Sequence, residues 1–159
     1  MKKLVLIVGL LALAVSCVSQ KPEEGNKMKT ERLTCFSFDH HNSMAQSGER
    51  YNISTMDDGR IHVVIDERSP EEKEFYLDDS TIFDELQAIV KAYKMDKYRR
   101  NYQPRVQIFD GDSWSLYYKY DSGRSVSSHG YMAWPKNYHE ARQALSDYFQ
   151  KWREYQAEP

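Results

Sequence analysis

Residues 114–123 read WSLYYKYDSG, and residues 124–128 continue as RSVSS. Large apolar or aromatic side chains stand at positions 114, 116, 118 and 120, which is the two-residue period of a strand with one buried face. Residues 121–123 have the composition of a tight turn, because glycine adopts the positive φ angle that such turns require. The stretch therefore predicts a β-hairpin whose second strand covers residues 124–128.

The same two-residue alternation predicts further strands on both sides of this hairpin. They cover residues 33–39, 51–56, 60–66, 75–77 and 105–109. Apolar residues at helical spacing predict two amphipathic helices, one over residues 81–93 and one over residues 138–152. Candidate cap residues precede each helix: Asp79, Ser80 or Thr81 before the first and Asn137 before the second.

These elements predict an α+β fold, in which an antiparallel sheet carries two amphipathic helices on one face as a two-layer sandwich. The helices superimpose when one is shifted by 59 residues, which places Leu86 on Leu145. The turns at Gly59 and Gly123 are 64 residues apart, so the two offsets disagree. A two-strand-plus-helix repeat is therefore only suggested, because such units also recur by chance.

Length and composition limit the classes of protein to which the chain belongs. The 159 residues suffice for one globular domain and a tail. A formal net charge of −2 offers no basic excess for a nucleic-acid partner, and we expect none. The apolar fraction of 40% allows a packed core and excludes a wholly disordered chain.

The first residues have the pattern of an export signal. Two lysines precede an apolar run over residues 4–15, which is shorter than the roughly 20 residues that span a bilayer. The run ends in Leu13-Ala14-Val15-Ser16-Cys17, which resembles the lipobox of bacterial lipoproteins. This resemblance implies a lipid on Cys17, although Ala14 stands where the family has leucine. The alternative is an ordinary cleavable signal, since Ala14-x-Ser16 also suits the enzyme that releases soluble proteins.

The lipobox resemblance defines three regions of the chain. Residues 1–16 are expected to be a signal peptide, residues 17–31 the lipidated cysteine and a flexible tether, and residues 32–159 a single α+β domain. Without Lys2 and Lys3, 20 basic residues remain against 24 acidic ones, so the mature chain has a net charge of −4. Glu23-Glu24 is similar to the surface-export signal of lipoproteins from Bacteroides-like bacteria, which leaves periplasmic and surface-exposed orientations at the outer membrane open. Residues 114–138 resemble small uncharacterised lipoprotein domains of such bacteria, and this resemblance implies no activity.

The residue patterns of common catalytic and metal sites are missing from the sequence. It has no His-x₃-His pair, no cysteine pair within a short spacing and no phosphate-cradling glycine loop, so we predict neither a metal nor a cofactor. The lone Cys35 lies in a strand-like run, where a small buried apolar role is expected. No catalytic residue is assigned, and we expect that the protein is not an enzyme.

One segment departs from the acidic character of the chain. Residues 91–105 contain six basic residues and one acidic residue, a net charge of +5, with three tyrosines between them. Arg99, Arg100 and Tyr102 are the predicted contacts for an anionic ligand, because residues 97–103 read as a loop and loops often carry function. The alternative is a solvated helix end, where cations offset the helix dipole.

A second candidate surface lies before the last helix. Residues 129–135 read as a loop, and Tyr131 and Trp134 would offer rigid aromatic area to a sugar or peptide. In the alternative interpretation, Trp134 plugs the core beneath the start of the helix.

The sequence thus predicts a lipid-anchored cell-envelope lipoprotein whose domain is a non-enzymatic binding or support module. Its expected partners are the membrane, through the lipid on Cys17, and an anionic glycan, a lipid or an envelope protein. The alternative is a cell-surface hydrolase or a glycan-binding accessory protein. A hydrolase of this kind would need two carboxylates that face each other across a cleft.

Overall fold

The computed structural model describes residues 31–45, 47–66, 72–106 and 108–155. The predicted signal peptide, Cys17 and the tether up to residue 30 lie outside the described residues. The strands are β1 (Leu33–Asn42), β2 (Ser47–Thr55), β3 (Ile61–Asp66), β4 (Lys73–Leu77), β5 (Asn101–Tyr102), β6 (Asp112–Tyr120) and β7 (Ser125–Tyr131). The helices are α1 (Thr81–Ala92), the short 3₁₀ helix η1 (Met95–Lys97) and α2 (Tyr138–Arg153).

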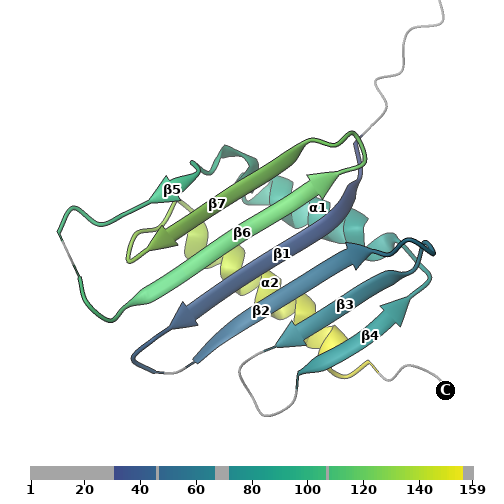
Figure 1. Ribbon diagram of the computed structural model, residues 1–159, viewed down its shortest axis with the longest axis horizontal. Helices are drawn as coiled ribbons and strands as arrows, with labels where there is room; N and C mark the ends of the chain where they lie inside the picture. Colours follow the sequence, from purple (N-terminus) through teal and green to yellow (C-terminus); the bar gives the residue numbers. More distant parts are fainter. Residues whose placement is uncertain (1–30, 46, 67–71, 107, 156–159) are drawn as a thin grey trace, which may run out of the picture.

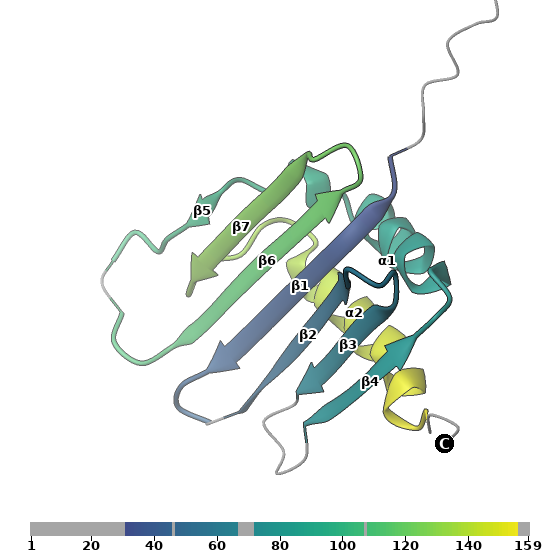
Figure 2. The ribbon, with the colours of Figure 1, turned by 45° about the vertical axis from the view of Figure 1, so that its right-hand side comes forward.

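The strands form one open seven-stranded sheet in the order β4-β3-β2-β1-β6-β7-β5 (Figure 1). All neighbours pair antiparallel except β5 and β7, which pair parallel. Figure 2 shows that α1 and α2 both cover the same face of this sheet. The predicted α+β architecture with both helices on one face is therefore confirmed.

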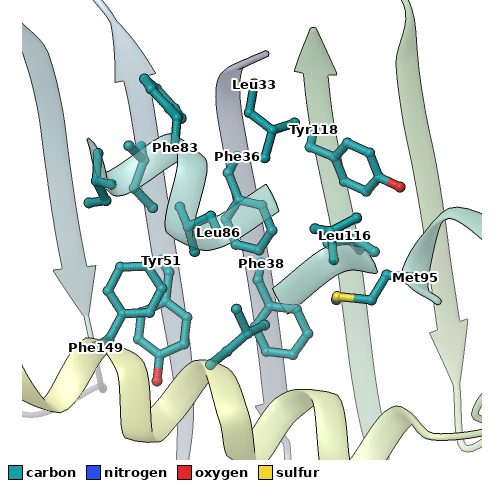
Figure 3. Close-up of a cluster of buried hydrophobic side chains, with 14 of the residues drawn as sticks. Leu33, Phe36, Phe38, Tyr51, Phe83, Leu86, Met95, Leu116, Tyr118 and Phe149 are labelled. Atoms are coloured by element: carbon teal, nitrogen blue, oxygen red, sulfur yellow. The ribbon is translucent and has the colours of Figure 1, made fainter. Parts of the chain in front are cut away.

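The core lies between the sheet and the two helices and is rich in aromatic side chains (Figure 3). Phe36 and Phe38 of the central strand β1 are 0% and 1% exposed. On the neighbouring strand, Tyr51 stacks on Phe149 of α2 with ring centroids 4.1 Å apart. Leu86 of α1 is also fully buried in this core. The alternation read from the sequence thus corresponds to the inner face of the sheet.

Three glycines serve the roles that only a residue without a side chain fills easily. Gly59 and Gly123 have φ angles of 87° and 88°, as the two predicted turns require. At Gly130 in β7, an added Cβ would lie 2.3 Å from Nε1 of Trp114 and 2.6 Å from the carbonyl oxygen of Ala133. The indole therefore packs directly on the backbone of β7.

The expected strand over residues 105–109 is wrong. The described residues of this stretch form no strand, and Val106 and Phe109 are 68% and 77% exposed. The strand occurs earlier, at β5, where it occupies the free edge of β7. Pro104 has no N–H group to continue a ladder, so pairing cannot extend into the apolar residues that follow.

The two halves of the chain are not equivalent. Four strands precede α1, whereas the strands between α1 and α2 include the two-residue β5. One of the two expected helix caps is present. Asp79 accepts the backbone N–H of Thr81 at 2.9 Å, as expected, whereas Asn137 has a φ angle of 65° and makes no side-chain cap.

Candidate anion-binding surface

The basic segment begins where α1 ends. Tyr93 donates its N–H to the carbonyl oxygen of Ile89 at 3.1 Å, and Lys94 then adopts a left-handed conformation with a φ angle of 54°. This residue turns the chain into η1, where Met95 is only 1% exposed and anchors the turn in the core. The lysines around Met95 are exposed, because the single apolar side chain between them holds the backbone close to the domain.

The backbone of the two predicted arginines is fixed to β7. The hydroxyl of Ser128 donates to the carbonyl oxygen of Arg99 at 2.6 Å, and the N–H of His129 donates to the carbonyl oxygen of Arg100 at 3.0 Å. The segment therefore runs along the edge of the sheet beside β7, as Figure 1 shows for β5. The two arginines project from a held backbone rather than from a free loop.

The side chains of Arg99 and Arg100 are exposed and have no carboxylate partner among the described residues, and Arg105 shares this property. Five other arginines do pair with carboxylates. They are Arg32 with Asp84, Arg50 with Asp39, Arg60 with Asp58, Arg124 with Glu31, and Arg142 with Glu49. The arginines of the basic segment thus keep their full capacity to bind an anion.

Tyr102 has a different position from the one expected of a ligand contact. It is 8% exposed, its ring lies 5.6 Å from that of Trp114, and its hydroxyl oxygen accepts the backbone N–H of Arg99 at 2.9 Å. The Arg99 guanidinium carbon lies 4.7 Å from the Tyr102 ring centroid, a cation–π contact. Tyr102 therefore supports Arg99 instead of offering an open aromatic face.

A hollow of about 220 Å³ lies beside this support. Its lining combines residues that follow α1 with residues that precede α2: Tyr93, Lys94, Lys97, Tyr98, Tyr102, Pro135, Lys136 and Asn137. The sequence singled out the first group as basic, but it offered no signal that Lys136 lies beside them. We call this feature the lysine hollow.

The Tyr98 hydroxyl is buried and has no hydrogen-bond partner within the described residues. Burial is the main cause that raises the pKa of Tyr98, with smaller contributions from Tyr102 and Glu140, so the phenol stays protonated and keeps its donor. Lys97 pairs with Asp96 at 3.1 Å, but the lysine is 77% exposed and such a surface pair is weak. The hollow is thus lined by cations, while the Tyr98 hydroxyl itself is closed to solvent.

Tyr131 and Trp134, the residues of the second predicted surface, do not form one patch. His129 and Tyr131 belong to β7 rather than to a loop, and Tyr131 points to the sheet face opposite buried Gly130. Trp134 is half-buried and packs on His139 of α2 with centroids 5.5 Å apart. Trp134 therefore packs against the core beside the start of the helix, and no ring contact joins it to Tyr131 in the described part of the chain.

Sequence reasoning missed two polar pairs that join α2 to the sheet, one of them partly exposed and the other buried. The Arg142 Nε donates to Glu49 at 2.6 Å, and this pair lines a shallow depression of about 230 Å³. The Tyr138 hydroxyl lies 2.9 Å from Nδ1 of His40, and both residues are at most 4% exposed. The members of each pair lie more than 90 residues apart, so no local pattern could reveal them. Within each pair, the two side chains satisfy each other's hydrogen-bonding groups, and both pairs hold α2 to the sheet.

Other chemistry-bearing groups are separate from the basic surface. Burial raises the pKa of the Cys35 thiol, which disfavours a thiolate. Glu140 and Asp147 line a wide depression of about 540 Å³, but both come from α2. Among the described residues, no three histidine, cysteine or acidic side chains gather in a way that could hold a metal ion.

Neither main helix in the described part of the chain is long and apolar enough to cross a bilayer. Comparisons with protein-family models, curated proteins and solved structures found no match to this chain.

Proposed function

We propose that the protein is a lipid-anchored component of a bacterial cell envelope whose domain binds an anionic ligand through Arg99 and Arg100. The observation that carries the binding proposal is the contrast among the arginines: five pair with carboxylates, whereas these two are exposed, unpaired among the described residues and held on a fixed backbone. A held backbone lowers the entropy that binding must overcome.

The anchor proposal rests on the sequence around Cys17. The described part of the chain begins at Glu31, which accepts two hydrogen bonds from Arg124, at 2.9 and 2.6 Å, and Arg32 binds Asp84 through two more, at 3.1 and 2.6 Å. The point at which the N-terminal segment joins the domain is therefore fixed beside the β6–β7 turn.

Lipidation is tested by expressing the full chain in a Gram-negative host with radiolabelled palmitate. We expect the label on the wild-type protein and on Cys35→Ser, and its loss from Cys17→Ser. Cys35→Ser is the matched control, because it removes the other cysteine of the chain. A Cys17→Ser protein that keeps the full label would contradict the anchor proposal.

Anion binding is tested on columns of polygalacturonate and dextran sulfate, with uncharged dextran as the reference. The Arg99→Ala/Arg100→Ala variant should elute at clearly lower salt than the wild type, because exposed charges act over about 8 Å at physiological ionic strength. The control Arg60→Ala/Lys119→Ala removes the same charge from exposed positions elsewhere. Equal elution of both variants would show that net charge alone causes retention, and the binding proposal would fail.

A further inference from the structure

We infer that the lysine hollow is a binding site for a phosphate group, with Lys94, Lys97 and Lys136 as its cations. The inference deepens the proposed function, on which it rests, by naming the anion and the residues that would hold it. It concerns a second place on the same surface, adjacent to Arg99 through the shared support of Tyr102.

The size of the hollow limits its ligand. A water molecule takes about 30 Å³ in the liquid, and pockets for drug-sized ligands hold about 300–1,000 Å³. A hollow of about 220 Å³ is therefore too small for a large organic ligand and large enough for one compact group with its nearest waters. A phosphate group, alone or at the end of a larger molecule, meets this limit.

The charge of the lining selects the sign of that group. Three lysines and no acid line the hollow among the described residues; Asp96 pairs with Lys97, and Glu140 acts on Tyr98 from a distance. Cations therefore outnumber acids around the site even before Arg99 and Arg100 are added. An ammonium group is a compact point charge, which suits an oxyanion of high charge density.

The number of cations favours phosphate over a carboxylate. Phosphate offers several acceptor oxygens to three lysines at once, whereas a single carboxylate offers two. Three charged donors around one small hollow thus favour phosphate.

The test is calorimetric titration of the full chain in a non-ionic detergent with inorganic phosphate, and with acetate at the same ionic strength. We expect phosphate to bind more tightly than acetate. Lys136→Met and Lys94→Met should each weaken phosphate binding about tenfold, as the loss of one charged donor implies. The control Lys119→Met makes the same change on the opposite sheet face and should bind like the wild type.

The source of the phosphate is distinguished with the Cys17→Ser chain, which removes the proposed anchor, and vesicles of phosphatidylcholine with or without phosphatidic acid. Weakening of both vesicle and inorganic phosphate binding by Lys136→Met supports recognition of the phosphate group itself. Weakening of inorganic phosphate binding alone supports free phosphate, rather than a lipid headgroup, as the ligand. Thermal melts of every variant show that the fold is intact.

Two results would separate this inference from the proposed function. If Lys136→Met and Lys94→Met bind phosphate like the wild type while Arg99→Ala/Arg100→Ala elutes early from the columns, the hollow is not the site and the proposed function stands. If the hollow variants lose phosphate while the arginine variant elutes unchanged, the hollow stands and the proposed role of the arginines fails. A wild-type chain that binds no phosphate overturns the inference outright.

Discussion

The hydrogen bond between Tyr138 and His40 fixes the start of α2 on the central strand, and its removal should lower stability measurably. The Tyr138 hydroxyl lies 2.9 Å from Nδ1 of His40, where the two residues are 1% and 4% exposed. Asp112 lies 3.9 Å from Nε2 of the same imidazole, which favours the tautomer with its proton on that nitrogen. Nδ1 therefore accepts the proton of the Tyr138 hydroxyl.

Tyr138→Phe removes this hydroxyl and keeps the ring. The packing of the ring on Trp114, with centroids 4.9 Å apart, should survive, so the change isolates the hydrogen bond. The variant leaves Nδ1 of a buried histidine without a partner, which costs about 1–3 kcal/mol. With an m-value of about 2 kcal/mol per molar, the urea midpoint should fall by about 0.5–1.5 M.

The measurement is urea unfolding followed by circular dichroism at pH 7.5, with Tyr117→Phe as the matched control. Tyr117 is 39% exposed on the opposite face of the sheet, and its substitution should change the free energy of unfolding by less than about 0.5 kcal/mol. If Tyr138→Phe has the same midpoint as the control, the hydroxyl does not anchor α2, and the role assigned to the pair is wrong.

Three further predictions concern the interior. Burial lowers the pKa of His40, so the unfolded chain binds a proton near pH 6.5 that the folded protein does not; stability should fall as the pH drops from 7.5 to 5.5, and His40→Gln should flatten that slope in urea titrations. Gly130→Ala should destabilise the fold by about 1–3 kcal/mol, because its Cβ would meet the Trp114 indole at 2.3 Å, whereas Ser127→Ala on the exposed side of β7 should be near neutral; equal melting temperatures would refute the close approach. Leu86→Ala should cost about 2–5 kcal/mol in the free energy of unfolding, since Leu86 is 0% exposed, and a loss below 1 kcal/mol would mean that α1 is not packed as described.

The elements that the sequence predicted well are those with one fully buried face. In β6, Trp114, Leu116, Tyr118 and Tyr120 are all buried while the residues between them are largely exposed, so the alternation is complete. Buried positions also alternate along β3, and they recur at helical spacing on the inner side of α1. A strong period arises only where one face meets the core along the whole element, because only then does burial restrict every second or every third to fourth position.

The elements that the sequence missed or misplaced lack such a period. A two-residue strand such as β5 has no alternation to detect, and its pairing depends on the free edge of β7. Val106 and Phe109 look like strand residues by composition, yet the edge of β7 already pairs with β5, the strand just before them in the chain. β-Propensity marks several segments as possible strands, but a segment forms a strand only where an unpaired strand edge lies beside it.

The candidate site divides in the same way. The basic segment was visible as a local excess of charge, which needs no knowledge of the fold. The sequence did not show that Arg99 of this segment is exposed while Tyr102 is buried and supports it, because the burial of Tyr102 depends on Trp114 of a later strand. Lys136 joins Lys94 only through the packing of the segment before α2 against the end of α1. Charge composition therefore locates such a surface, and tertiary contacts decide which residues form it.

The fixed junction at Arg124 also bears on how an anchor and the basic surface would act together. Arg124 precedes β7, and the contacts of β7 with the two arginine carbonyls come from Ser128 and His129. At about 3.4 Å per strand residue, the junction and those contacts are only about 15 Å apart along the same strand. An extended tether of residues 18–30 would add up to roughly 3.3–3.6 Å per residue, so the basic surface would stay within tens of ångströms of the lipid. Under the anchor proposal, tethering at that distance would raise the effective concentration of envelope anions around Arg99 and the lysine hollow, so even weak intrinsic affinity would suffice for occupancy at the membrane.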